Sequence, residues 1–427
     1  MIFNNSKFNS HWPTKALNEL GTFNRGKSKH RPRNDIKLFK NGNIPLIQTG
    51  DVKQANIFIK THSNNYNEFG LAQSKLWTKG TLCITIAANI AETSMLDYDM
   101  CFPDSVVGFN AFPDECSETF MHYIFTYIRA GIQSRIQGSI QDNINIEYLT
   151  NLKFKIPIKE ERIQIENLLF SFDSKIEINN KINQELEAMA KTLYDYWFVQ
   201  FDFPDKNDKP YKSSGGKMVF NEDLKREIPV GWEVEEINNV IKVKDGTHDS
   251  PKSIKKGFKL ITSKHLKLEG LDFEKANYIS KEDYVNINKR SQVENGDILF
   301  SMIGSIGTVY KIEEKNIDFA IKNVALYKTS GNQNLKNYIY MYLKGYDMQK
   351  YMGNVIAGSI QKFIGLGSLR KMPIMFDEKT ISNFEVKTKS IFNQINTLKL
   401  ENQKLSELRD WLLPMLMNGQ LRVGGED

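Results

Sequence analysis

Two long stretches of heptad-patterned sequence constrain the fold of this chain more than any other feature. Along residues 160–200, apolar side chains recur at alternating steps of four and three, the narrow seam of a coiled coil rather than the wider stripe of a surface helix. The pattern returns along residues 384–412. Asparagine interrupts the seam at Asn179, Asn183 and Asn402, and a polar residue there fixes register at some cost in stability. The sequence therefore predicts two long helices with a defined alignment.

Length and composition indicate a soluble protein with more than one domain. A chain of 427 residues exceeds a typical single core, and 40% apolar with 25% charged residues is a globular composition. No apolar run has membrane-spanning length and the N-terminus lacks a signal-peptide pattern, so we expect a cytoplasmic protein with no membrane partner. Three cysteines without paired spacing indicate neither disulfides nor zinc. The net charge of +6 permits nucleic-acid binding without requiring it.

The chain also contains an internal repeat with a period of about 220 residues. Trp12 corresponds to Trp232, and the tetrapeptide Gly-Ser-Ile-Gln occurs at residues 138–141 and again at 358–361. The two heptad stretches keep the same phase when they are superposed at an offset of 219. A period of this length marks a duplicated domain rather than a solenoid. We therefore predict two homologous mixed α/β domains, each followed by a long helix.

Turn and linker signals give boundaries for these parts. Short β-rich runs predict strands at 44–51, 82–88, 259–262, 297–302 and 324–327, and helical spacing predicts helices at 120–132 and 338–348. We expect the second long helix to break at Pro414. The predicted parts are a first domain (1–156), a first long helix (157–200), a polar Pro/Gly-rich linker (201–228), a second domain (229–374), a second long helix (375–418) and a tail (419–427).

Motifs for catalysis are sparse. The sequence has no Walker-type phosphate loop, no Asn/Asp-Pro-Pro-aromatic loop of an amino-methyltransferase and no histidines at metal-ligand spacing. One loose match to a nuclease pattern places Asp205 and Asp223 before Lys225, and such acids could hold Mg²⁺ beside a phosphate. A self-contained Mg²⁺-dependent nuclease is therefore one alternative. An interaction protein whose coiled coil serves oligomerisation is another.

Binding chemistry is better represented, because a basic loop occurs at the same place in both copies. A mobile basic loop can follow DNA phosphates, and Gln, Lys, Ser, Thr or His beside it can reach base edges. We predict DNA contacts in the first copy at Arg25, Lys27, Lys29, His30, Arg31, Arg33, Gln48, Thr49 and Lys53. We predict them in the second copy at Thr247, His248, Lys252, Lys255, Lys256, Ser263, Lys264 and His265. From charge alone, a solvated surface loop is an equally simple interpretation of the basic segments, and for any single candidate beside them a strand-end residue that satisfies a turn is the simpler one.

Across nearly its whole length the chain resembles the specificity (S) subunits of type I restriction–modification systems. The resemblance rests on the Gly-Ser-Ile-Gln segment at 138–141 leading to Ile-Pro-Ile at 156–158, and on the helix ending Leu-Tyr-Asp-Tyr-Trp-Phe-Val at 193–199. It rests also on residues 203–218, on Ile-Pro-Val-Gly-Trp at 228–232 and on the closing segment 412–419. The leads into the two long helices, at 158–164 and 375–378, depart from the usual family pattern.

The resemblance implies an α+β fold in which two target-recognition domains are joined by an antiparallel intramolecular coiled coil with a pseudo-twofold repeat. Each domain would read one half of a split site on double-stranded DNA, and the helices would set the gap between the halves. The implied partners are two methyltransferase (M) subunits and restriction (R) subunits. Those partners, and not this chain, would use S-adenosylmethionine, ATP and Mg²⁺. The chain itself would hold no cofactor, no metal and no catalytic residue.

Overall fold

The computed structural model of the protein describes residues 2, 4–137, 144, 146–267, 270–356 and 362–424. Both Gly-Ser-Ile-Gln segments lie outside the described residues. The chain forms two compact units, Met1–Asn180 together with Leu400–Asp427, and Lys181–Lys399. The first is called unit 1 and the second unit 2. Within the described ranges, no helix combines the length and apolar content needed to cross a membrane.

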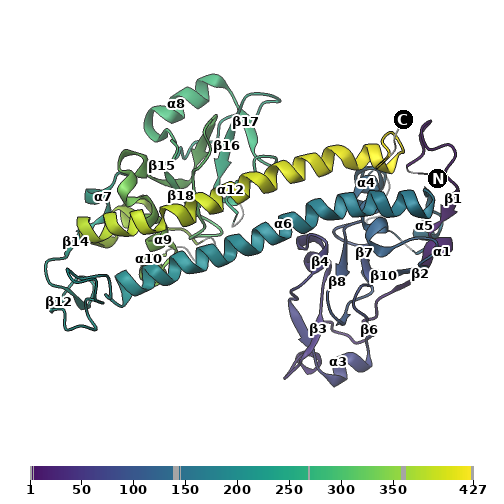
Figure 1. Ribbon diagram of the computed structural model, residues 1–427, viewed down its shortest axis with the longest axis horizontal. Coiled ribbons are helices and arrows are strands. Elements are labelled where there is room, and N and C mark those ends of the chain that lie inside the picture. The colour runs from purple at the N-terminus through teal and green to yellow at the C-terminus, as the bar shows by residue number, and fades with distance from the viewer. Residues whose placement is uncertain are drawn as a thin grey trace. The chain divides into compact units, whose positions relative to one another are not determined.

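The two predicted long helices are α6 (Lys159–Tyr194), followed by the π-helical turn η2 (Asp195–Val199), and α12 (Glu378–Met417) (Figure 1). Each helix contributes one end to each unit. In unit 1 Asp173 of α6 pairs with Arg409 of α12, and in unit 2 Trp197 packs against Phe384. Because the residue numbers rise along one helix as they fall along the other, the pairing within each unit is antiparallel. The predicted fold class is confirmed.

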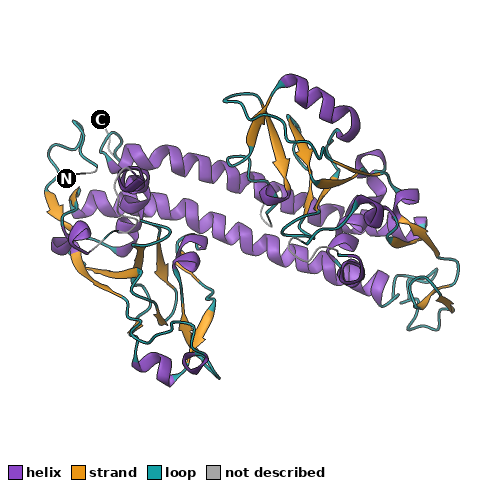
Figure 2. Ribbon diagram, turned by 180° about the vertical axis from the view of Figure 1, so that it is seen from behind, coloured by secondary structure: helices purple, strands orange, loops and turns teal. Residues whose placement is uncertain are grey.

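Unit 1 is built on short strands joined by long loops (Figure 2). Its larger sheet has the strand order β2-β10-β7-β8-β4 and its smaller sheet the order β5-β3-β9-β6. A separate pair, β1 with β11, joins the start of the domain to its end. The strands are β1 (Thr14–Ala16), β2 (Gly21–Arg25), β3 (Ile44–Leu46), β4 (Phe58–Ile59), β5 (Asn64–Tyr66), β6 (Leu76–Trp77), β7 (Leu82–Thr85), β8 (Thr93–Leu96), β9 (Met100–Cys101), β10 (Val106–Ala111) and β11 (Lys153–Lys155). The shorter helices are α1 (Leu17–Leu20), η1 (Ile36–Leu38), α2 (Thr49–Gln54), α3 (Glu68–Ala72), α4 (Glu118–Gln137) and α5 (Ile146–Thr150).

Unit 2 repeats this scheme. Its sheets have the orders β15-β21-β18-β19 and β17-β16-β20, with β14 paired to β22 and the hairpin of β12 and β13 added before them. The strands are β12 (Met218–Asn221), β13 (Arg226–Pro229), β14 (Glu233–Glu236), β15 (Val243–Asp245), β16 (Phe258–Thr262), β17 (Asn277–Ile279), β18 (Ile298–Ser301), β19 (Val309–Lys311), β20 (Phe319–Lys322), β21 (Val324–Tyr327) and β22 (Pro373–Phe376). The shorter helices are α7 (Ile237–Val240), η3 (Ser263–His265), α8 (Lys281–Ser291), η4 (Thr329–Gly331), η5 (Gln333–Leu335), α9 (Lys336–Lys344), α10 (Tyr346–Val355) and α11 (Leu366–Arg370).

The two units share their topology down to single backbone hydrogen bonds. Strand order β2-β10-β7-β8 matches β15-β21-β18-β19, and the parallel pair β3–β9 matches β16–β20. Gly26 N–H donates to Val106 O at 2.9 Å, and Gly246 N–H donates to Val324 O at 3.0 Å. Each unit encloses its own apolar core, to which both long helices contribute side chains such as Leu169 and Leu416 in unit 1. The predicted duplication is therefore present in the structure.

Four local predictions are wrong, each for a physical reason. The predicted strand at 82–88 ends at Thr85, because the backbone turns at Ala88, whose φ of 60° is left-handed. The predicted strand at 44–51 ends at Leu46, because the Gln48 N–H donates to the Asp51 carboxylate at 2.6 Å and starts α2. The predicted helix at 338–348 divides at Gly345, whose backbone is extended. Helix α12 does not break at Pro414 but continues to Met417. Proline removes one hydrogen bond there, while burial of Leu416 and Met417 in the unit 1 core holds the final turn.

Candidate nucleic-acid interface

The first basic loop of unit 1 begins, directly after strand β2, at a position that only glycine fits. A Cβ on Gly26, which follows β2, would lie 2.3 Å from the carbonyl oxygen of Phe102. The loop therefore starts pressed against the β9–β10 connection. Arg25, Lys27 and Lys29 are exposed, and their charged groups make no hydrogen bond or ion pair with any described residue. These three cations are free to meet an anionic partner.

The other predicted cations of this loop brace it instead. His30 Nε2 lies 2.8 Å from Asp35 Oδ2, and Arg31 donates to the carbonyl of Ser28 at 2.5 Å. Arg33 Nη2 donates to both oxygens of Asp104, at 2.7 and 2.9 Å. The backbone N–H of Lys37, and then His30, hold the pKa of Asp35 below its usual value. The carboxylate of Asp35 therefore stays charged and keeps its contacts with His30 and the Lys37 N–H within the loop.

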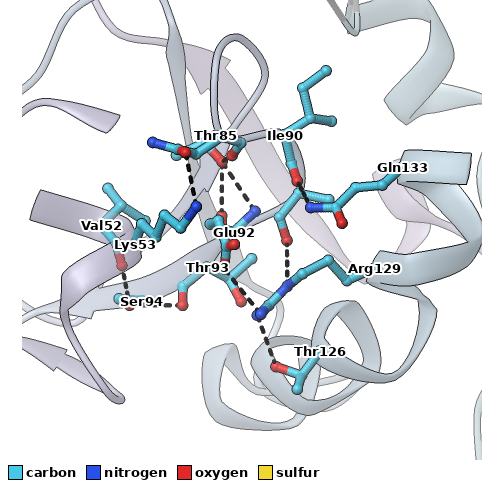
Figure 3. Close-up of polar contacts among 12 residues, drawn as sticks. Val52, Lys53, Thr85, Ile90, Glu92, Thr93, Ser94, Thr126, Arg129 and Gln133 are labelled. Carbon is cyan, nitrogen blue, oxygen red and sulfur yellow. Dashed lines mark hydrogen bonds and ion pairs between the residues drawn. The ribbon is translucent and has the colours of Figure 1, made fainter. Parts of the chain in front are cut away.

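The predicted base-reading residues Gln48, Thr49 and Lys53 lie together on α2. Gln48 is exposed at the N-terminal end of this short helix, and Thr49 is its first residue. Lys53 Nζ donates to Asn89 Oδ1 at 3.1 Å, on the loop that follows β7 (Figure 3). The structure thus brings this trio next to a loop that the sequence analysis did not select.

That loop, residues 86–92, is held from several sides (Figure 3). Arg129 of α4 donates to Ala91 O at 3.3 Å and pairs with Glu92 at 2.9 Å, and Gln133 donates to Ile90 O at 2.8 Å. Ala88 and Ala91 adopt left-handed backbone conformations, with φ of 60° and 61°. At an offset of 216, unit 2 has Gly304 and Gly307 in the same conformation. That alignment is the sequence signal that could have revealed the loop.

The second basic loop begins at the equivalent position of unit 2. A Cβ on Gly246 would lie 2.1 Å from the carbonyl oxygen of Ile321, so this loop too is pressed against its sheet. Thr247 Oγ1 accepts the N–H of Asp249 at 3.1 Å, and His248 Nδ1 lies 2.8 Å from Asn323 Oδ1. Lys252, Lys255 and Lys256 are exposed, with no hydrogen bond or ion pair to the described part of the chain. The three unpaired lysines thus come after a loop start that hydrogen bonds hold in place.

Of the predicted turn residues at 263–265, only Lys264 exposes its side chain. Ser263 Oγ donates to Asn323 O at 2.8 Å. His265 Nδ1 accepts the N–H of Thr262 at 3.0 Å, and burial lowers the pKa of this histidine, so it is neutral at pH 7. In this conformation, Ser263 and His265 shape the turn that presents Lys264.

The sequence analysis selected His248 in unit 2 but missed two residues beside it, Asp245 and Arg290. The carboxylate of Asp245 is bound by Arg290 and lies 2.9 Å from His248 Nε2. Asp245 and Arg290 are 45 residues apart, on β15 and α8, so no local pattern connects them.

The three asparagines predicted on the helix seam differ in their hydrogen bonds. In unit 1, Asn179 Nδ2 donates to Glu401 Oε2 at 2.8 Å and to Asn402 Oδ1 at 2.9 Å. Asn402 Nδ2 in turn donates to Asn180 Oδ1 at 2.7 Å. In unit 2, Asn183 Oδ1 is buried without a hydrogen-bond partner among the described residues. Of the three predicted seam asparagines, Asn179 and Asn402 make interhelical hydrogen bonds among the described residues.

The acids of the loose nuclease pattern serve local turns. Asp205 Oδ1 accepts the backbone N–H groups of Asn207 and Lys209, at 2.7 and 2.9 Å. Asp223 lies in the turn between β12 and β13, and its N–H donates to Asn221 Oδ1. Within the ranges that the structure describes, no three His, Cys, Asp or Glu side chains gather in a way that could hold a metal ion.

A duplicated mixed α/β domain, an antiparallel helix pair and a basic loop at the same place in each copy define a two-domain DNA-specificity protein. The chain belongs to the type I restriction modification DNA specificity domain family, whose model matches residues 9–188 and again 229–409. It therefore contains two recognition domains of this family, one in each half.

Individual relatives agree with this assignment. The specificity subunit of the type I restriction enzyme MjaIX from Methanocaldococcus jannaschii is 25% identical, in an alignment that covers 96% of this chain and 94% of the relative. The HindI specificity subunit from Haemophilus influenzae is 24% identical over 65% of this chain and 71% of its own length. A crystal structure of the S subunit from M. genitalium has a TM-score of 0.51 at 17% identity and covers 97% of this chain and 99% of its own. That structure shows a shared fold.

Proposed function

We propose that this chain is the non-catalytic DNA-recognition subunit of a cytoplasmic type I restriction–modification complex, with each domain reading one half of a bipartite site on double-stranded DNA. The observation that carries the proposal is one scaffold present twice with different exposed loops. The first presents Arg25, Lys27 and Lys29, whereas the second presents Lys252, Lys255 and Lys256 beyond His248. Two unlike surfaces suit a split site whose halves differ in sequence.

The long helices suit the role of spacer between the two half-sites. Helix α6 has 36 residues and α12 has 40. At about 1.5 Å per residue, the shorter one is about 54 Å long, which exceeds one turn of DNA, about 34 Å. The hydrogen bonds from Asn179 to Glu401 and Asn402 oppose sliding of one helix along the other in unit 1. A spacer with a fixed register gives a fixed gap.

Exposed apolar side chains on the helices offer docking sites for two M subunits. On α12 in unit 1, Leu400, Leu408 and Trp411 lie on one face, and Trp411 is 62% exposed. The offset of 219 that superposes the helices places Met189 of α6, 58% exposed in unit 2, on Leu408. Large exposed apolar side chains mark interaction surfaces. One such position in each copy supports a stoichiometry of two.

The docking face can be tested by charge substitution. Trp411→Lys and Leu408→Lys should each weaken binding of the M subunit at least tenfold. The reason is that an aromatic or apolar anchor at the centre of an interface typically contributes about 2 kcal/mol to the binding free energy. Gln403→Lys, exposed on the flank of the same helix, is the matched control and should bind normally. Calorimetric titration with purified M subunit measures the affinities. Normal binding by both lysine variants would place the M subunit elsewhere.

The chemistry of the complex belongs, in this proposal, to the partners. M subunits would methylate adenine with S-adenosylmethionine, and R subunits would use ATP and Mg²⁺ to restrict DNA. The chain alone should neither methylate nor cleave DNA, and with its M subunit it should methylate one bipartite sequence. Methylation by the isolated chain would contradict the proposal. Mg²⁺-dependent cleavage by the isolated chain, lost in Asp223→Asn, would favour the nuclease alternative.

A further inference from the structure

Asp245 in unit 2 is a buried carboxylate that contacts two exposed side chains, those of Arg290 and His248. Its side chain is 2% exposed, whereas those of Arg290 and His248 are 57% and 64% exposed. Oδ1 accepts a hydrogen bond from Arg290 Nη2, and Oδ2 lies 2.9 Å from His248 Nε2. A buried carboxylate without partners is strongly unfavourable. These contacts therefore orient the side chains of both Arg290 and His248.

Regular structure holds this cluster. Asp245 is the last residue of β15 and pairs with Ala325 on β21. The next residue, Gly246, packs closely on Ile321, since a Cβ built there would lie 2.1 Å from the Ile321 carbonyl oxygen. Arg290 lies in the last turn of α8, whose first turn is capped by Ser280 Oγ accepting the N–H of Asp283 at 3.0 Å. Side chains supported by strands, helices and a buried partner are positioned more accurately than loop side chains.

The surroundings of the cluster favour a polyanion. His248 Nδ1 lies 2.8 Å from Asn323 Oδ1, which anchors the start of the second basic loop to the β20–β21 connection. Lys322 Nζ donates to Ser250 Oγ on that loop, and the exposed Lys252 follows. The side chains of Arg290 and His248 thus lie at the base of the second basic loop, which carries Lys252, Lys255 and Lys256.

The geometry leaves Arg290 with donors to spare. Only its Nη2 binds Asp245, and its Nε and Nη1 have no hydrogen-bond partner among the described residues. A guanidinium held by a carboxylate presents a rigid planar edge, which matches O6 and N7 of guanine in the major groove. Neutralising the buried acid accounts for the Nη2 contact, and it leaves the Nε and Nη1 donors of the 57% exposed guanidinium available to a ligand.

The described residues of unit 1 contain no equivalent arrangement at the corresponding position. At the offset of 220 that superposes Gly26 on Gly246, Asp245 corresponds to Arg25, whose charged group has no partner among the described residues. A base contact made by Arg290 would therefore affect one half-site and leave the other unchanged. The asymmetry supplies an internal control.

We propose that Arg290 reads a guanine in the half-site of the second recognition domain and that Asp245 is its positioning residue. The inference rests on the proposed function and adds the residue and the base. A direct test is genome-wide mapping of N6-methyladenine in cells that carry the complete system, with Arg290→Ala, Arg290→Gln and Asp245→Asn compared with Lys289→Ala. Lys289 is the exposed neighbour of Arg290 on α8 and serves as the matched control.

Arg290→Ala should relax one guanine position of one half-site by about tenfold to hundredfold, with the other half-site unchanged. Arg290→Gln should shift that position toward adenine, because glutamine pairs with adenine. Asp245→Asn should partly relax the same position, and Lys289→Ala should change nothing. A purely structural role for Arg290 would not move the base preference.

Two outcomes would overturn the inference. One is an unchanged methylated sequence in both Arg290 variants. The other is uniform weakening at all sites with a smaller salt dependence, the signature of a phosphate contact. Either leaves the proposed function intact, because the wild-type chain still directs methylation to a bipartite sequence. Absence of any site-specific methylation by the wild-type chain with its M subunit would instead refute the proposed function itself.

Discussion

His122 is a buried imidazole in unit 1 whose ionisation opposes folding. It is 6% exposed, and its Nδ1 lies 3.0 Å from Thr93 Oγ1. Burial, with the nearby Arg129 and Arg409, lowers the pKa of His122 to about 3, against about 6.5 for an unfolded histidine. The unfolded chain therefore binds this proton more readily. Stability from the neutral imidazole is complete above about pH 6.5 and is lost as the pH falls toward 3.

Replacing His122 by asparagine, which keeps an acceptor near Thr93, should flatten the acid limb of stability. Between pH 6 and pH 4 the wild-type free energy of unfolding should fall by about 1.4 kcal/mol per pH unit more than that of His122→Asn. Denaturant unfolding at several pH values measures both slopes. Parallel slopes would show that His122 does not titrate on unfolding.

Backbone strain distinguishes the two copies at single residues. Ala88 has a φ of 60° in an exposed turn, and the equivalent residue in unit 2 is Gly304, with a φ of 75°. A left-handed conformation costs a non-glycine residue about 1–2 kcal/mol, partly offset by the greater freedom of glycine in the unfolded chain.

Reciprocal substitutions test this difference. Ala88→Gly should raise the free energy of unfolding of unit 1 by about 0.5–1 kcal/mol, and Gly304→Ala should lower that of unit 2 by about 1 kcal/mol. A Cβ on Gly304 meets no atom within 4 Å, so only the backbone term changes there. Calorimetric unfolding of the intact chain measures both. Changes of the opposite sign would show that the turns are relaxed.

At the scale of elements, the buried carboxylate of Asp173 connects three helices of unit 1, namely α4, α6 and α12. Tyr123 of α4 donates to Asp173 Oδ2 at 2.7 Å, and Arg409 of α12 pairs with Asp173 Oδ1 on α6. At an offset of 219, Asp173 corresponds to Phe392, which packs edge-on against Tyr340 in unit 2. Thus Asp173 pairs by charge with the other long helix in unit 1, whereas the corresponding Phe392 of α12 packs on α9 in unit 2.

Removing one side of the charged pair should be costly. Asp173→Asn removes the buried counter-ion of Arg409 and leaves this 20% exposed guanidinium with only the exposed Asp410 as an ionic partner. Unit 1 should therefore lose about 3 kcal/mol of stability, the lower end of the cost of breaking a buried pair. The double variant Asp173→Leu with Arg409→Leu should recover most of this loss, because apolar packing replaces the pair. Equilibrium unfolding in urea measures the three proteins. A double variant as unstable as the single one would argue for an irreplaceable ionic contact.

The elements also show what local sequence can predict. Residues 324–327 form the predicted strand without any shift, since a short β-rich run buried on both faces has one consistent solution. The predicted helix break at Pro414 was wrong because burial of the following residues in the unit 1 core outweighs the low helix propensity of proline. The division at Gly345 was missed because a helical pattern continues on both sides of it.

At the scale of the whole molecule, duplication was the predictable part. The Trp12–Trp232 correspondence and the shared heptad phase predict two copies of one domain, and the strand orders agree. The basic loops could also be predicted from the sequence, because their charged residues are clustered along the chain. The Asp245–Arg290 pair is not, because it joins a strand to a helix 45 residues away. Contacts between distant elements need the fold before they can be found.

The central claim is that two recognition domains read two half-sites across a helical spacer. It predicts the effect of inserting one heptad after Asn180 in α6 and a matching heptad before Leu400 in α12, which preserves the seam. Seven residues add about 10 Å, or about three base pairs at 3.4 Å each. An insertion in α6 alone is the control, and it should impair methylation because the seam no longer matches.

The deciding measurement is genome-wide mapping of methylated adenine in cells that carry the paired-insertion chain with its partner subunits. The account predicts the two wild-type half-site sequences, unchanged, separated by a gap about three base pairs longer. Altered half-site sequences, or the wild-type gap retained by a fully active complex, would contradict it.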